Sequence, residues 1–301
     1  MRWNFKKIEA EDVEILPRFY KLRSNKTCDS VFLDTFLWKD YYHVEYCVVD
    51  EKAVEWKMKV DGVPFAALPL CTEEDLPYYF FDMKNYFNEE LGEKLRIYLA
   101  DEEAVKLLDL DPEQFDVVEN TDAADYLYDG EALRTLAGKK YHKKKNHVNA
   151  FMKEYEGRYE YRTLCCSDRG DMWKFLDRWR AMKGAQMEGT LDPEVEGIHS
   201  ILNQCSDLGV RMGGIYVDGQ MEAFTMGSYN EAEDMAIIHI EKANPEIRGL
   251  YPFINQQFLV HEFPTVSLVN REDDVGLPGL RKAKQSYNPI GFAKKYQIRE
   301  K

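Results

Sequence analysis

Hydrophobic and polar positions divide the chain into two successive series of predicted elements. Alternation predicts strands, and apolar residues spaced by three and four predict helices. An Asp-Gly pair between strand-like runs, a strong hairpin signal, occurs at Asp61-Gly62 and at Asp218-Gly219. The first half is predicted to contain a strand at 5–8, a helix at 15–22, a hairpin of 54–60 with 63–70, a strand at 78–81, a helix at 89–99 and a strand at 115–118. The second half is predicted to contain a strand at 159–164, a helix beginning after Ser167-Asp168, a hairpin of 210–217 with 220–229, a strand at 235–240, a helix at 249–263 and a strand at 266–269.

Both series follow the order strand, helix, hairpin, strand, helix, strand, which predicts one α/β unit used twice. A helix from Gly130 to Tyr155 is expected to close the first half. We therefore expect an N-terminal domain at 1–156 and a C-terminal domain at 157–301.

Composition excludes some classes of protein. The net charge of −14 argues against a broad nucleic-acid-binding face. The N-terminus lacks an apolar signal region, and the longest nearly apolar stretch, Val63 to Cys71, is too short to span a bilayer. No integral membrane segment is expected. The six cysteines form no C-x-x-C pair, so free thiols and a reducing cytoplasmic location are expected, with Cys165-Cys166 as a buried pair of thiols.

The turn Arg248-Gly249 lies between a predicted strand and a predicted helix. Free N–H groups at a helix N-terminus bind phosphate or a carbonyl oxygen, and acyl transfer needs such donors for the oxyanion. An ordinary strand-to-helix connection is the alternative interpretation, and this segment alone favours it.

A dense polar cluster follows the last predicted strand. Glu272 and Asp273 could bind an amine or act as a general base. Arg281 and Lys284, on one face of a short helix, could bind phosphate or carboxylate. A solvated acidic loop followed by a basic helix face explains the same residues equally well.

Five lysines cluster at Lys139, Lys140, Lys143, Lys144 and Lys145. They could contact phosphates of RNA or of lipid headgroups. The exposed face of a long helix is the favoured interpretation, less strongly than usual because the rest of the chain is acidic.

The remaining candidates are weaker. His239 and Glu241 lie on one side of a predicted strand, but no C-x-x-C follows to complete a zinc deaminase pattern, so structural roles are favoured. The sequence has no G-x-S-x-G, no P-loop and no H-E-x-x-H motif. No metal site is expected.

The sequence resembles the bacterial DUF2156 family, whose domain matches the C-terminal domain of phosphatidylglycerol lysyltransferases. The resemblance spans nearly the whole chain. It is carried by Asp125–Tyr128 with Leu133–His147, by His239–Asn255, and most specifically by Asn270–Tyr287 with Tyr296.

This resemblance implies an α+β (α/β) fold of two tandem GNAT-like (acyl-CoA N-acyltransferase) domains, related to the Fem peptidyl transferases, with mixed central sheets flanked by helices. It also implies transfer of an acyl or aminoacyl group, from acyl-CoA or aminoacyl-tRNA, to an amine or hydroxyl acceptor. The acceptor could be a small molecule, a peptide or a lipid headgroup. The implied site lies in the second half.

Two departures bear on the substrates. Aligned on Gly249, the GNAT pyrophosphate loop Q/R-x-x-G-x-G/A reads Glu246-Ile247-Arg248-Gly249-Leu250-Tyr251. Glu246 replaces the basic residue, and the bulky Tyr251 would crowd a pyrophosphate, which argues against tight CoA binding and for an aminoacyl-tRNA donor. The membrane domain of full lysyltransferases is not in this sequence, so a lipid acceptor would be reached from the cytosol.

The leading hypothesis is an aminoacyltransferase. Catalytic candidates are Glu272, Asp273 and Glu241; donor-binding candidates are Arg248, Gly249, Asn270, Arg281, Lys284 and Tyr287; candidate tRNA contacts are Lys139, Lys140, Lys143, Lys144 and Lys145. The alternatives are a non-catalytic GNAT-like module that binds a small anion, and an RNA-binding adaptor that uses only the lysines.

Overall fold

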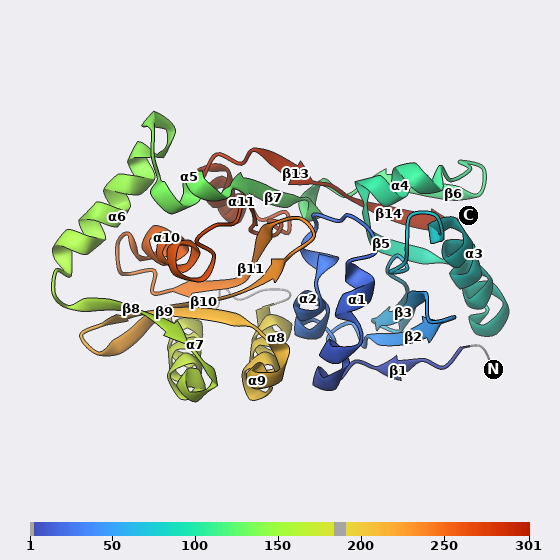
Figure 1. Ribbon diagram of the computed structural model, residues 1–301, viewed down its shortest axis with the longest axis horizontal. Coiled ribbons are helices and arrows are strands. Elements are labelled where there is room, and N and C mark those ends of the chain that lie inside the picture. Colours follow the sequence, from blue (N-terminus) through green and yellow to red (C-terminus); the bar gives the residue numbers. More distant parts are fainter. Residues whose placement is uncertain (1–2, 184–190) are drawn as a thin grey trace. The chain divides into compact units, whose positions relative to one another are not determined.

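A computed structural model describes residues 3–183 and 191–301 (Figure 1). The chain forms two compact units. Unit 1 comprises Met1–Asp125, Asp273–Leu277 and Phe292–Lys301, and unit 2 comprises Tyr126–Glu272 and Pro278–Gly291. These limits differ from the expected division, because the boundary expected between 156 and 157 falls inside unit 2.

Two strands explain this division. Strand β7 (Asp125–Asp129) precedes the expected boundary but pairs with β12 (Leu268–Asn270) in a sheet of second-half strands. Strand β14 (Lys295–Glu300), at the C-terminal end of the chain, lies between β5 (Arg96–Asp101) and β6 (Phe115–Glu119) in a sheet of first-half strands. Each half of the sequence therefore contributes a strand to a sheet formed mainly by the other half.

Unit 1 contains a four-stranded sheet of order β1-β2-β3-β4 and a three-stranded sheet of order β5-β14-β6. A parallel bridge between Ala66 and Ile97 links the end of β4 to β5. A hydrophobic core that includes Phe80, Phe87 and Ile298 packs between its elements. The remaining elements of this unit are β1 (Lys6–Lys7), α1 (Pro17–Tyr20), α2 (Phe32–Leu37), β2 (Glu45–Val49), β3 (Ala53–Val60), β4 (Val63–Phe65), α3 (Leu76–Tyr86) and α4 (Glu102–Leu108).

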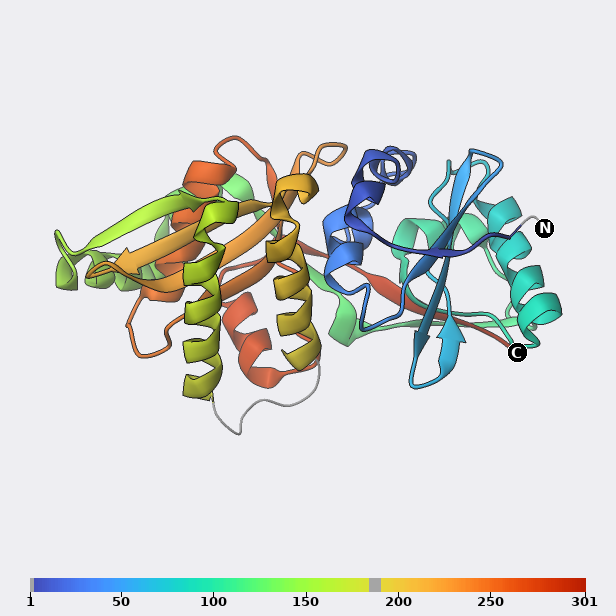
Figure 2. The ribbon, with the colours of Figure 1, turned by 90° about the horizontal axis from the view of Figure 1, so that it is seen from below.

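Unit 2 is built on a sheet of order β13-β7-β12-β11-β10-β9-β8, in which β11 and β12 are parallel and the other assigned pairs are antiparallel. Helix α10 packs against β9, β10 and β11, while α7 packs against β10 and β11. Figures 1 and 2 show α10 on one face of this sheet, and α7 and α8 side by side on the other. The elements not yet bounded are α5 (Gly130–Thr135), α6 (His142–Glu154), β8 (Tyr159–Leu164), α7 (Arg169–Lys183), α8 (Leu191–Asn203), α9 (Cys205–Leu208), β9 (Arg211–Val217), β10 (Gln220–Asn230), β11 (Met235–Ala243), α10 (Leu250–Glu262), α11 (Pro278–Gln285) and β13 (Gly291–Ala293).

A shorter repetition than the predicted one is present in the order of the elements. An antiparallel series of three strands, β2-β3-β4 or β9-β10-β11, is followed by a helix, α3 or α10, and then by a strand, β5 or β12. Both Asp-Gly turns form with positive φ, at Asp61-Gly62 and Asp218-Gly219. They are not equivalent, however, because the first joins β3 to β4 and the second joins β9 to β10.

Three predicted elements of the first half were wrong. The aromatic run 78–81 lies in helix α3, because Leu76, Phe80 and Met83 are buried along one helix face. The helix expected at 89–99 ends at Leu91, where Gly92 adopts a left-handed φ of 67°, and β5 begins at Arg96. The helix expected at 130–155 is divided into α5 and α6 between residues 135 and 142.

The expectation of six free thiols is contradicted. Cys166 and Cys205 form a disulfide, and Cys165, expected to be a buried thiol beside Cys166, is exposed. Cys28, Cys47 and Cys71 are free and buried. The two bonded cysteines are 39 positions apart in the sequence, so a search for closely spaced cysteines does not identify them.

Among the described residues, no helix has the combination of length and apolar character that crossing a membrane requires.

Candidate functional site

The candidate site lies where β12 leaves β11. The two strands pair in parallel only from Met235–Leu268 to Ile237–Asn270. Strand β12 ends at Asn270, whereas β11 continues to Ala243 and remains paired with β10. Beyond these three pairs the backbones of β11 and β12 are no longer paired with each other, and side chains that follow on the two segments are in contact instead.

His239 lies at this position between two hydrogen-bonding partners. Its Nδ1 is 2.9 Å from Glu272 Oε1, and its Nε2 is 2.7 Å from Ser228 Oγ. The imidazole is fully buried, and the side chain of Glu272 is 21% exposed. A register shift in the β10–β11 ladder leaves His239 as the extra residue opposite the bond between Met226 and Gly227. The resulting bulge orients His239 beside Ser228.

A second pair joins the same two segments. Arg271 Nη2 is 3.0 Å from Glu241 Oε1, and both side chains are nearly buried. Asn255 of α10 donates from Nδ2 to the other carboxylate oxygen, Oε2, at 2.9 Å. The charges of Glu241 and Arg271 are therefore neutralised by one another, with an additional hydrogen bond to the carboxylate.

Aromatic rings and a second cation surround Arg271. Its guanidinium carbon lies 4.4 Å from the centroid of the Tyr287 ring, and Lys144 Nζ lies 3.7 Å from the same centroid. Burial raises the pKa of Tyr287 to about 12. Burial, together with the neighbouring Arg271 charge, lowers the pKa of Lys144 to about 8. Lys284 Nζ donates to the backbone oxygen of Arg271.

The lowered pKa of Lys144 predicts a pH dependence of stability. Between about 8 and the ordinary value of 10.5, the unfolded chain holds a proton that the folded chain has released. Stability therefore rises with pH across this window. We expect Lys144→Met to flatten this rise in urea unfolding measured across the window, whereas Lys143→Met, at the exposed neighbouring position, leaves it unchanged. Identical slopes for the two variants would contradict the prediction.

The two pairs lie on opposite faces of the sheet. Glu241 bonds to Asn255 of α10, so it faces α10. Phe224 packs against Phe175 of α7, and Ser228, four residues further along β10, points to the same side. The Ser228–His239–Glu272 chain therefore faces α7, and the two pairs form separate clusters on the two faces of the sheet.

The predicted donor-binding turn lies beside α6. Gly249 has a left-handed φ of 84°, and a Cβ at this position would lie 2.2 Å from the backbone oxygen of His147. Only glycine fits this approach of two backbones, so packing is sufficient to explain Gly249. Arg248 is exposed. Burial, followed by the charge of Arg248, lowers the pKa of His147.

The acidic cluster at 270–274 is divided between the two units. Asn270 is buried, and its Oδ1 accepts a hydrogen bond from the backbone N–H of Glu272 at 2.6 Å. This bond holds Glu272 at its left-handed φ of 57°. Asp273 belongs to unit 1, and its Oδ1 accepts from the backbone N–H of Val275 at 2.9 Å. Arg281 lies, partly buried, on α11.

The five lysines do not share one environment. Lys139, Lys140, Lys143 and Lys145 are exposed, as a surface that contacts phosphates requires. Lys144 is half-buried over Tyr287 and belongs to the Arg271 cluster.

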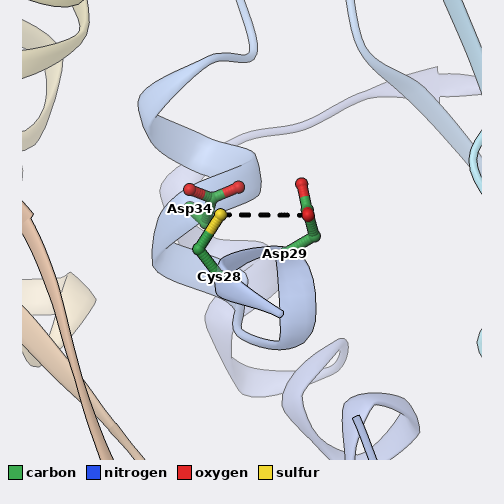
Figure 3. Close-up of side chains that lie close together, drawn as sticks. All are labelled: Cys28, Asp29 and Asp34. Atoms are coloured by element: carbon green, nitrogen blue, oxygen red, sulfur yellow. Dashed lines mark hydrogen bonds between the residues drawn. The ribbon is translucent and has the colours of Figure 1, made fainter. Parts of the chain in front are cut away.

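Three potential metal ligands of unit 1 lie close to one another and beside a buried lysine. Figure 3 shows the carboxylates of Asp29 and Asp34 beside the thiol of Cys28. Lys295, which is 1% exposed, donates from Nζ to Cys28 Sγ at 3.1 Å and lies 3.0 Å from Asp29 Oδ2 and 2.9 Å from Asp125 Oδ1. The ammonium supplies the positive charge that a metal would supply, and we assign no metal here.

Sequence reasoning missed three of the residues that the structure brings together. His239 was assigned a structural role, and Ser228 and Arg271 were not among the candidates. Ser228 and His239 lie on the two strands of one hairpin, so their pairing could have been anticipated from the turn between them. Glu272 contacts a residue of β11 that is 33 positions away in the sequence, and Arg271 contacts one that is 30 positions away. Contacts over such separations cannot be predicted from a local sequence pattern.

Several known proteins are similar to this chain in sequence or fold. The family model "Phosphatidylglycerol lysyltransferase, C-terminal" matches residues 20–299. A conserved protein of unknown function from Bacteroides thetaiotaomicron has 28% identity, with 99% of each chain covered and a TM-score of 0.91. The C-terminal domain (DUF2156) of a protein described as a lysylphosphatidylglycerol synthetase from Agrobacterium fabrum has 16% identity, with 96% of this chain and 92% of that one covered and a TM-score of 0.71.

A tandem GNAT protein from the clavulanic acid biosynthesis pathway has 10% identity, with 99% of this chain and 98% of that one covered and a TM-score of 0.52. The structures from Agrobacterium fabrum and from the clavulanic acid pathway, at 16% and 10% identity, show the fold. It is GNAT-like, as the resemblance of the sequence implied. The chain belongs to the family of phosphatidylglycerol lysyltransferase C-terminal domains.

Proposed function

We propose that this protein transfers an aminoacyl or acyl group to an amine or hydroxyl acceptor, with His239 as the catalytic base. The single observation that carries the proposal is the His239–Glu272 pair at the point where β12 leaves β11. An ionised carboxylate only accepts hydrogen bonds, so Glu272 holds the proton of His239 on Nδ1. Nε2, which lies 2.7 Å from Ser228 Oγ, is then the acceptor nitrogen and can remove a proton from a hydroxyl or amine that reaches this position.

Two features favour aminoacyl-tRNA as the donor over acyl-CoA. The exposed side chains of Lys139, Lys140, Lys143 and Lys145 could each neutralise a phosphate. Tyr251, in the first turn of α10, accepts a hydrogen bond from Trp179 Nε1 at 3.4 Å and fills space that a pyrophosphate would need there. The cytoplasm, where aminoacyl-tRNA is found, is the proposed location.

The test uses the purified protein and two labelled donors. We expect label to pass from a mixture of aminoacyl-tRNAs, rather than from acetyl-CoA, to one of three acceptors: a small amine, a peptide or phosphatidylglycerol vesicles. His239→Asn is expected to slow transfer by about 10²–10⁴-fold, because the base is lost. Glu272→Gln is expected to slow it too, because the imidazole tautomer is no longer fixed.

His261→Asn is the matched control, since His261 is an exposed histidine of α10 stacked on Tyr161. It should transfer at the wild-type rate. If wild type consumes neither donor, the proposed function is wrong. If His239→Asn keeps full activity, the proposed base is wrong.

A further inference from the structure

Ser228, His239 and Glu272 form a continuous hydrogen-bonded chain in unit 2. The Oγ–Nε2 distance of 2.7 Å and the Nδ1–Oε1 distance of 2.9 Å both lie within the range expected between a nucleophile, its base and the carboxylate that orients the base. The three residues come from β10, from the bulge of β11 and from the segment after β12. Such an arrangement is identified by geometry and not by sequence order.

We propose that Ser228 is a nucleophile that carries the acyl group between donor and acceptor. The direction of the hydrogen bonds supports this role. With the His239 proton held on Nδ1 by Glu272, Nε2 must accept, so the Ser228 hydroxyl donates to it. Ser228 is half-buried, whereas the imidazole is fully buried, so the hydroxyl is the member of the pair that a substrate can reach.

The reaction has two balanced steps. In the first, Ser228 Oγ attacks the acyl carbon; the bond from that carbon to the donor oxygen or sulfur breaks, and His239 passes the Ser228 proton to the leaving group. In the second, the acceptor amine or hydroxyl attacks the seryl ester while His239 takes its proton, and the proton returns to Ser228 Oγ. This two-step transfer rests on the proposed function, but the activation of Ser228 by His239 does not.

The activation of Ser228 can be tested without a natural substrate. A small alkyl fluorophosphonate forms a bond from phosphorus to an activated serine oxygen and releases fluoride, while His239 accepts the proton. We expect one adduct on the folded wild-type protein, located by peptide mass spectrometry at Ser228. Ser228→Ala should abolish it, and Glu272→Gln and His239→Asn should each slow labelling at least about 100-fold.

Ser286→Ala is the control, because Ser286 Oγ donates to the backbone oxygen of Ala283 rather than to a histidine. It should label at the wild-type rate. Circular dichroism establishes which variants are folded; if His239→Asn is not folded, Glu272→Gln, at the partly exposed member of the chain, decides. Absence of an adduct on wild type, or equal labelling of Glu272→Gln and wild type, overturns the role of Ser228. If wild type transfers the acyl group but forms no adduct at Ser228, the proposed function stands, and the acceptor attacks the donor directly.

Discussion

Replacing Lys295 with Met should destabilise unit 1 by about 3–5 kcal/mol, the cost of removing one partner from a buried ion pair. Lys295 is 1% exposed, and Asp125, its partner at 2.9 Å, is fully buried. Met keeps the length of the side chain but leaves the carboxylate of Asp125 without the ammonium. Hydrogen exchange of the β2 and β3 amides, together with urea unfolding, measures the loss.

The stabilisation by Lys295 should depend on pH in a definite direction. The carboxylates of Asp125 and Asp29 raise the pKa of Lys295 well above 10.5, although burial opposes them. The stabilisation is therefore fully present below 10.5 and is lost as pH rises through the folded-state value.

Lys294→Met is the matched control for this experiment. Lys294 precedes Lys295 directly, but its side chain is 42% exposed and its ion pairs with Glu102 and Glu119 lie at the surface. Exposed pairs contribute little, so this variant should unfold like wild type. Equal losses in the two variants would show that the buried cluster does not stabilise unit 1.

Local signals in the sequence predicted much of the second half. The Asp218-Gly219 turn, strand β11, helix α10 and helix α11 form where the pattern placed them. Each depends on residues that are close in sequence. In the first half, the aromatic run at 78–81 has high β propensity, yet burial of Leu76, Phe80 and Met83 along one face stabilises a helix instead. Tertiary packing therefore overrode local preference.

The site was only partly predictable for a similar reason. Glu272 was identified as a candidate from its position after the last predicted strand, and Glu241 from the side of a strand that it shares with His239. Their partners, His239 and Arg271, are determined by the bulge in β11 and by the end of the β11–β12 ladder at Ile237–Asn270. Neither the bulge nor the end of the ladder leaves a pattern in a single sequence. Arg248, a donor-binding candidate, lies exposed in the turn before α10.

The second large effect is expected at the Arg271–Glu241 pair. Arg271→Met should cost unit 2 about 3–5 kcal/mol, because Glu241 is left buried with a charge that Asn255 alone cannot neutralise. Urea unfolding measures this loss. Arg180→Met provides the control, since Arg180 pairs with Asp192 at the surface with side-chain exposures of 39% and 70%.

The double variant Arg271→Met/Glu241→Leu separates stability from function. Replacing both members of a buried pair with apolar side chains is often neutral or stabilising, so the double variant should recover most of the stability that Arg271→Met loses. If the pair serves only the fold, transfer activity should return with stability. If Arg271 or Glu241 also contacts a substrate, the double variant will be folded and inactive. A double variant as unstable as the single one would contradict the prediction, because the loss would then come from packing of the arginine side chain against Tyr287 rather than from an unpaired charge.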